Sequence, residues 1–147
     1  MEIKVMGFRK ALAHTPLVPT LAMRIFDSDA DPIIKRPLVC SPFYKIYCYT
    51  FDDLDMDIIH ALYPNDKSYL RRVHFSEDIA KQILTDFENS RQGMLELLVH
   101  CTLGANRSPA VAIALNEIFG LGHNTDEMKT KYSAFNRYVY RLMKEAA

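Results

Sequence analysis

One short stretch, from His100 to Ser108, constrains the fold of this chain most strongly, because it contains a cysteine and an arginine that are separated by five residues. The mainly apolar residues 94–99 come directly before it, and the apolar residues 109–115 come directly after it. The first run predicts a buried strand, and the serine and proline that open the second predict the start of a helix. Strand, loop and helix in this order place a nucleophile and a fixed cation at the two ends of one loop. The sequence therefore predicts an α/β fold with a nucleophilic, phosphate-binding site.

The loop between this strand and helix is expected to bind phosphate through its backbone and one side chain. A short loop that closes onto a helix N-terminus can direct several N–H groups at one anion. Gly104 permits a positive φ or a close backbone approach, and Arg107 offers a planar fork that can bind two phosphate oxygens, which lysine cannot match. The candidate phosphate-binding residues are Thr102, Leu103, Gly104, Ala105, Asn106 and Arg107.

Cys101 is the candidate nucleophile of this site. A free cysteine has a pKa near ~8.5, and a helix N-terminus or a nearby cation favours its thiolate, so we expect Cys101 to be ionised at neutral pH. Ser108 has two expected roles: it caps the following helix, in which Pro109 takes the first position, and its hydroxyl donates to the Cys101 sulfur. The alternative is a buried, inert cysteine beside an ordinary turn, but the combination of residues in this order favours the functional reading.

The motif His-Cys-x5-Arg-Ser resembles the phosphate-binding loop of the cysteine-dependent protein tyrosine phosphatases, particularly small, bacterial-type dual-specificity phosphatases. Its place in the C-terminal half, the single helix expected before the motif strand, and residues 134–141 are also similar to that group. The chain departs from the pattern in two ways. It has no tryptophan, and therefore no Trp-Pro-Asp acid loop, and Leu103 and Asn106 are unusual loop residues.

The resemblance implies two further catalytic residues. His100 is implied to support the loop geometry and the thiolate through hydrogen bonds. An aspartate after the preceding strand is implied to protonate the leaving group, and Asp53 is the first choice because small bacterial relatives resemble its Phe-x-Asp pattern. Asp52, Asp55 and Asp66 remain alternatives, and any of these four carboxylates could instead be a solvated loop residue. Asn136 either braces the phosphate loop, positions water or packs in a helix.

Size and composition exclude several classes of protein. A chain of 147 residues predicts a single domain spanning residues 1–147. Its 18 basic and 18 acidic residues cancel, which argues against nucleic-acid binding and membrane-surface binding. Three cysteines without zinc-type spacing, and no stretch resembling a secretory signal, lead us to expect a reducing, cytoplasmic location. We expect no metal, no cofactor and no membrane span.

Hydrophobic patterns predict the remaining elements. We expect strands at residues 3–12, 21–26 and 44–51, with Cys48 in the core. Residues 52–72 are expected to form a loop with a short helix at 56–62. Longer helices are expected at residues 76–91, from the end of the motif to Phe119, and from Ser133 onward. The predicted fold is a mostly parallel sheet with helices on both faces, resembling a dual-specificity phosphatase, with the active loop at the carboxyl end of the motif strand.

Three functions remain open at this point. The favoured one is a metal-independent phosphomonoester hydrolase that works through a cysteinyl-phosphate intermediate. The second is a catalytically weak, phosphate-recognising binding module. The third is a thiol-dependent sulfur-transfer or arsenate-reducing enzyme, which needs Cys40 or Cys48 close to Cys101.

If the favoured function holds, we expect the substrate to be a phosphorylated protein or a small phosphomonoester. Relatives with this loop process phosphotyrosine, phosphoserine or phosphothreonine, phosphoinositide and RNA 5′-phosphate, and all of these remain open. The lack of clustered Lys or Arg beside the motif argues against polyphosphate and RNA. Residues 63–69 either form an aromatic wall for an aryl substrate or pack on the core. The sequence does not indicate the oligomeric state.

Overall fold

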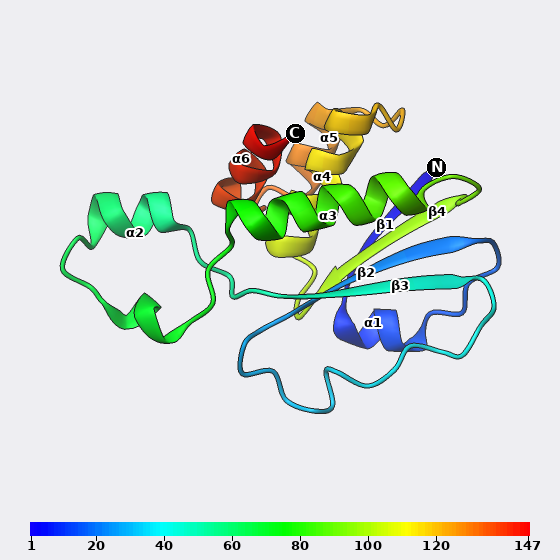
Figure 1. Ribbon diagram of the computed structural model, residues 1–147, viewed down its shortest axis with the longest axis horizontal. Coiled ribbons are helices and arrows are strands. Elements are labelled where there is room, and N and C mark those ends of the chain that lie inside the picture. Colours follow the sequence, from blue (N-terminus) through cyan, green and yellow to red (C-terminus); the bar gives the residue numbers. More distant parts are fainter.

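The structure, a computed structural model, describes residues 1–147 as four parallel strands and the helices that cover them (Figure 1). The strands are β1 (Glu2–Gly7), β2 (Thr20–Phe26), β3 (Tyr44–Thr50) and β4 (Glu96–Cys101), in the sheet order β1-β4-β2-β3. The helices are α1 (Phe8–Ala13), α2 (Met56–Leu62), α3 (Glu77–Ser90), α4 (Arg107–Phe119), α5 (Thr125–Lys131) and α6 (Arg137–Ala146), with a 3-10 turn, η1, at Ser68–Arg71.

The predicted fold class is confirmed: all strand pairs are parallel, and helices lie on both faces of the sheet. Parallel strands carry their carboxyl ends at one edge, where ligands bind in open α/β sheets. The register brings Gly7 opposite Cys101 and Arg24 opposite His100. The end of β1 therefore lies beside the start of the motif loop, although the two segments are far apart in the sequence.

One face of the sheet carries the main hydrophobic core. Alternate residues of the two central strands, among them Met23 and Val99, are fully buried there together with Ile83 and Phe87 of α3. Every residue of α4 from Arg107 to Asn116 is buried, which explains why this helix is apolar on all sides rather than amphipathic. The element that begins at the active loop is thus the most deeply embedded helix of the protein.

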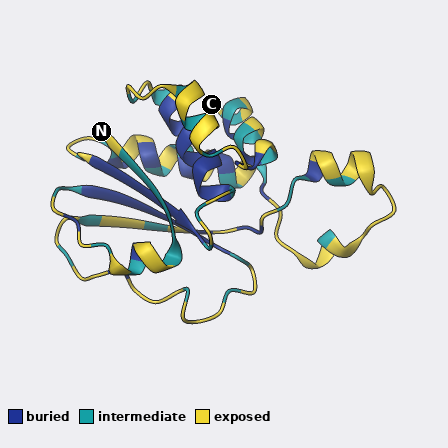
Figure 2. Cartoon of the chain, turned by 180° about the vertical axis from the view of Figure 1, so that it is seen from behind, coloured by how far each residue is buried: buried dark blue, intermediate teal, exposed yellow.

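The opposite face is covered more thinly, by α1 and the loop that joins β2 to β3. Its small cluster consists of Ala11, Ala22, Leu38 and Leu98. These elements leave the outer strand β3 bare on this face, as its exposed residues show (Figure 2), and Ile46 is 44% exposed there. Cys48 shares this face because it lies two residues further along the strand, so the expectation that Cys48 lies in the core is wrong: it is exposed.

Two predicted boundaries also need correction, and one helix was missed. The first strand ends at Gly7 rather than continuing to residue 12, and the chain turns into α1, which buries Ala11. The last helix starts at Arg137 rather than at Ser133, because the Asn136 side chain caps it by accepting from the Val139 N–H. The helix α5 was not predicted, although Asn124 caps it in the same way.

A segment of residues 54–74 projects away from the rest of the protein (Figure 1). It contains α2, as expected, and η1. Leu62 and Leu70 are 66% and 70% exposed. The proposed aromatic wall at residues 63–69 belongs to this segment, where Tyr63 is exposed, so it does not pack on the core. None of the helices in the structure is both long enough and apolar enough to cross a membrane.

Candidate active site

Residues 102–106 form a loop from the end of β4 to the start of α4, at the carboxyl edge of the sheet. Gly104, at its centre, has a φ of +75°, and a Cβ atom there would lie 2.5 Å from the Met6 carbonyl carbon. Both reasons for expecting glycine here, a positive φ and a close approach, are therefore confirmed. At the end of β1, a Cβ atom on Gly7 would lie 3.0 Å from the Thr102 carbonyl oxygen. The loop is consequently packed backbone to backbone against the end of β1.

The thiol of Cys101 lies at the base of this loop and is only 2% exposed. Its Sγ accepts a hydrogen bond from the Gly104 N–H at 3.2 Å and lies 3.2 Å from the Ser108 Oγ. Ser108 is thus placed beside the sulfur as expected. Its predicted role as N-cap is wrong, because α4 already begins at Arg107, with Asn106 in the cap position.

The Arg107 guanidinium, 4% exposed, is held at one end only. Its Nη1 donates to the Phe51 carbonyl oxygen at 2.8 Å and lies 2.6 Å from the Asp27 Oδ1. Its Nη2 has a single contact, with the Thr102 Oγ1 at 3.5 Å, the limit of a hydrogen bond, and its Nε is buried without any partner. The edge formed by Nε and Nη2 is therefore available to a bidentate anion.

Asp27, at the end of β2, is a site residue that the sequence analysis missed. Besides Arg107, it accepts a hydrogen bond from the Thr102 hydroxyl at 3.1 Å. The carboxylate thus holds both ends of the phosphate loop at once. One signal was available in the sequence, since Asp27 directly follows a predicted strand, and the carboxyl ends of parallel strands meet at one edge.

A cavity of about 210 Å³ opens above the thiol, and it brings together most of the predicted site residues. The residues that line it are Asp27, Asp53, Cys101, Thr102, Leu103, Asn106 and Arg107. Ala105 is exposed and does not line this cavity. Neither Cys40 nor Cys48 lines it either, and both are free and exposed.

Asp53 reaches this cavity from the loop that follows β3. Its Oδ1 accepts a hydrogen bond from the Asn136 Nδ2 at 2.9 Å. The same amide nitrogen donates to the Leu54 carbonyl oxygen, while the backbone N–H of Asn136 donates to the Asn106 carbonyl oxygen at 2.9 Å. Asn136 therefore connects three parts of the site: the loop of residues 51–55 that carries Asp53 (the acid loop), the loop of residues 102–106 (the phosphate loop) and the start of α6.

The other candidate acids occupy different environments. Burial alone would raise the pKa of Asp52, but hydrogen bonds from Ser28, Val73 and Arg72 lower it to about 2. Asp55 caps α2 by accepting from the Ile58 N–H.

Asp66 lies exposed on the projecting segment and accepts from the Ser68 N–H, which lowers its pKa. Neither Asp52, Asp55 nor Asp66 lines the cavity above Cys101.

His100 is fully buried on the face of the sheet opposite Cys101, and its side-chain hydrogen bond joins it to Arg24 and not to the thiol. Its Nε2 accepts from the Arg24 Nε at 2.8 Å, and its Nδ1 has no partner. Burial and the neighbouring Arg24 cation lower the pKa of His100 to about 4, so the ring is neutral at pH 7. Arg24, which the sequence analysis also missed, donates in addition to the carbonyl oxygens of Ile34 and Arg36. It thereby fixes the loop after β2 against the motif strand.

No group of three or more His, Cys, Asp or Glu side chains in the structure could hold a metal ion. The concentrated positive charge at the site is the Arg107 guanidinium, supported by the N–H groups at the start of α4.

Comparison with solved structures shows which known proteins share this fold. The crystal structure of Tk-PTP in the active form matches with a TM-score of 0.55 and 15% identity, over 99% of this chain and 91% of that chain. The tyrosine phosphatase OH1 from the Orf virus matches with a TM-score of 0.47 and 15% identity, over 98% and 82% of the two chains. PTPMT1 matches with a TM-score of 0.48 and 12% identity, over 99% and 88%.

The fold is that of a protein tyrosine phosphatase, as the resemblance in the sequence implied. No family model matches the chain, and no curated protein sequence matches it.

Proposed function

We propose that this protein is a phosphomonoester hydrolase that works through a cysteinyl-phosphate intermediate. The observation that carries the proposal is the free edge of Arg107, whose Nε is buried without a partner in the wall of the cavity that contains Cys101. A buried cationic donor without an acceptor is costly to maintain. A phosphate bound in the cavity supplies two acceptor oxygens to this edge.

In the first step of the proposed reaction, the Cys101 thiolate attacks phosphorus and the bond from phosphorus to the leaving oxygen breaks. Asp53 gives its proton to that oxygen; its Oδ1 accepts from Asn136, so its Oδ2 is the oxygen that carries the proton. The Gly104 N–H and the Ser108 hydroxyl lie within hydrogen-bond distance of the Cys101 sulfur, where they stabilise its negative charge.

In the second step a water molecule attacks the cysteinyl-phosphate. Asp53, now ionised, takes a proton from this water, and the bond between phosphorus and sulfur breaks to release phosphate and the thiolate. The Ser108 hydroxyl donates to the departing sulfur. Arg107 and the loop N–H groups balance the charge on the phosphoryl oxygens in both steps.

The proposed substrate is a phosphorylated protein or a small phosphomonoester, and the proposed location is the cytoplasm, where a reducing environment keeps Cys101 as a thiol. The fold that this chain shares with Tk-PTP supports this class of substrate. The arsenate-reducing alternative is not favoured, because Cys40 and Cys48 lie outside the cavity.

Release of phosphate from phenyl phosphate by the wild-type protein and by Cys101→Ser tests the proposal. We expect turnover by the wild type, a loss of at least about 10⁴-fold in the variant, and a phosphorylated Cys101 after acid quenching of the wild-type reaction. Turnover that persists in Cys101→Ser would contradict the assignment of the nucleophile. Binding of inorganic phosphate without turnover in the wild type would show a binding module instead.

A further inference from the structure

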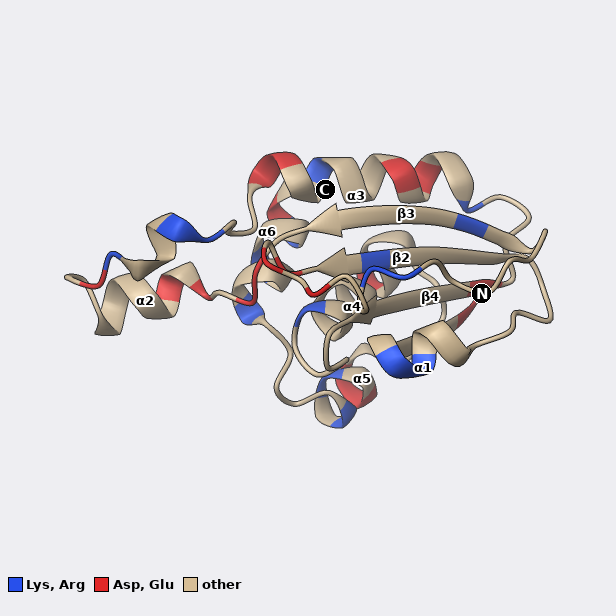
Figure 3. Cartoon of the chain, turned by 90° about the horizontal axis from the view of Figure 1, so that it is seen from below, with Lys and Arg blue, Asp and Glu red and all other residues tan.

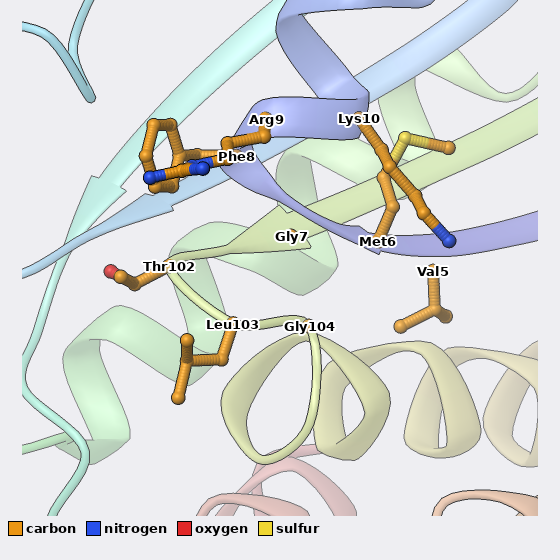
Figure 4. A pocket seen from close by; sticks show the side chains of 9 residues that line it. All are labelled: Val5, Met6, Gly7, Phe8, Arg9, Lys10, Thr102, Leu103 and Gly104. Atoms are coloured by element: carbon orange, nitrogen blue, oxygen red, sulfur yellow. The ribbon is translucent and has the colours of Figure 1, made fainter.

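A groove beside β1 adjoins the cavity above Cys101, which we call the phosphate pocket. Its volume is about 370 Å³, and it shares Thr102 and Leu103 with the cavity above Cys101. The residues that line it are Val5, Met6, Gly7, Phe8, Arg9, Lys10, Thr102, Leu103 and Gly104 (Figure 4). A leaving group bound through its phosphate at Arg107 can therefore pass over Thr102 and Leu103 into this groove.

The charges around the phosphate pocket are distributed unevenly. The loops beyond the carboxyl ends of β2 and β3 carry six aspartates against the two cations Lys35 and Arg36, whereas the only charged residues of α1 are Arg9 and Lys10 (Figure 3). Asp27 and Asp53 line the pocket on the acidic side, where the nearby cation Arg72 is already paired with Asp52. The acidic residues of the two loops are Asp27, Asp29, Asp31, Asp52, Asp53 and Asp55. A second negative group on a substrate is repelled on that side and attracted toward α1.

Arg9 is the cation best placed to bind such a group. Its guanidinium lies over the Phe8 ring, 5.8 Å from the centroid, and forms no ion pair with any carboxylate. Both side chains extend to the side of β1 where Thr102 lies, whereas Lys10 extends in the opposite direction (Figure 4). The aromatic ring thus packs against a cation whose N–H donors have no partner. Arg9 and Thr102 line the same groove, although 93 positions separate them in the chain.

The groove and the phosphate loop are held together rigidly. The Phe8 N–H donates to the Thr102 carbonyl oxygen at 3.3 Å, and the backbones of Gly7 and Gly104 leave no room for a side chain between them. The backbone that carries Arg9 is therefore fixed relative to the phosphate loop, and a fixed arrangement of two binding groups lets remote binding energy orient a substrate for reaction.

We propose that this groove is a leaving-group subsite, in which Arg9 binds a second anionic group of the substrate. The inference rests on the proposed function and narrows its substrate class to phosphomonoesters whose alcohol carries a carboxylate or a second phosphate. It also revises one conclusion from the sequence: there is no Lys or Arg cluster beside the motif in the chain, but the fold brings Arg9 and Lys10 to it.

Two matched pairs of substrates test this proposal: 3- and 4-carboxyphenyl phosphate, each compared with its neutral carboxamide. We define the charge preference as kcat/KM for the carboxylate divided by kcat/KM for the carboxamide, measured at low ionic strength. We expect Arg9→Gln to lower this preference about fivefold for at least one pair, with the carboxamide rate nearly unchanged. The matched control is Lys45→Gln, which removes an exposed cation at the amino end of β3, far from the site. It should leave the preference within twofold of the wild type.

Binding of the same compounds to Cys101→Ser, with and without Arg9→Gln, separates the subsite from the chemistry. A charge preference in the dissociation constant that disappears with Arg9→Gln supports the subsite even if the wild type shows no turnover, in which case only the proposed hydrolysis fails. Turnover with the same charge preference in Arg9→Gln and the wild type overturns the subsite and leaves the hydrolase intact.

Discussion

The phosphate loop and the acid loop are built in different ways, although they face the same cavity. The phosphate loop is held by backbone packing, with Gly104 against the end of β1 and α4 buried behind it. The acid loop is held by side chains: Asp53 by the Asn136 amide, and Asp52 by Ser28 and Arg72. Beyond them the chain enters the projecting segment of residues 54–74.

This difference predicts which reaction parameters a substitution in each loop should change. Changes at the phosphate loop alter a geometry that is set by the fold, so they should affect the binding and the reaction of every substrate. Changes at the acid loop alter one proton donor, so their effect should depend on the leaving group. The following predictions test this division, beginning with the largest expected effect.

Arg107→Lys should lower kcat/KM by about 10³-fold for all phosphomonoesters. The ammonium group keeps the charge but cannot present two parallel donors to phosphate and also contact Asp27 and the Phe51 carbonyl oxygen. The measurement is kcat/KM for phenyl phosphate and for 2,4-dinitrophenyl phosphate, and equal losses are expected. Near-normal kinetics would mean that this loop does not bind the transferred phosphoryl group.

Asp53→Asn should lower kcat for phenyl phosphate by about 10²-fold. The loss for 2,4-dinitrophenyl phosphate should be below about tenfold, since its acidic phenol leaves without a proton. The matched control is Asp55→Asn, in which the amide still caps α2. If Asp53→Asn slows both substrates equally, Asp53 positions the loop and does not donate a proton.

Asp27→Asn should lower kcat about tenfold for both substrates without raising KM. The amide holds the Nη1 of Arg107 less firmly than the carboxylate does, whereas removal of a negative charge beside the pocket favours phosphate binding. Asp29→Asn, on the same loop but exposed, is the control and should be neutral. An increase in KM with an unchanged kcat would show that Asp27 contacts substrate instead of positioning Arg107.

Asp52→Asn should lower the free energy of unfolding at pH 7 by about 2 kcal/mol. The folded-state pKa of Asp52, about 2, lies below its ordinary value of 3.8, so its stabilising contribution is complete above pH 4. This contribution is lost as the pH falls through 2, and the two proteins should approach equal stability there. Urea unfolding of both proteins between pH 2 and pH 7 measures the difference, and a constant difference would contradict the role of the Asp52 charge.

The phosphate loop could be predicted from the sequence because its determinants are local. Cys101, Gly104 and Ser108 lie within eight consecutive positions, and the flanking apolar runs identify the strand and the helix that orient them. The contacts among these residues then follow from the short loop. The exact start of α4, and with it the cap assigned to Ser108, could not be predicted from the pattern, because helix ends shift by one or two residues.

Residues that act on the loop from a distance could not be found in this way. Asp27 and Arg24 are 80 and 76 positions away from Arg107 and His100, the residues they contact, and no local pattern links such pairs. The location of Cys48 was predicted wrongly for a similar reason. The strand is apolar enough to suggest burial, but whether an outer strand is covered depends on which helices pack on it. Here α1 and the loop after β2 leave it bare.

The contact of Gly104 with the end of β1 has a consequence for how the protein folds. It joins residues 6 and 7 to residue 104, so the loop reaches its final shape only after the first strand has docked beside β4. Closing so long a stretch of chain is slow compared with forming the helices. Partly folded chains should therefore contain most of the helices yet bind no oxyanion. Vanadate affinity followed during refolding would report the moment at which the sheet is complete.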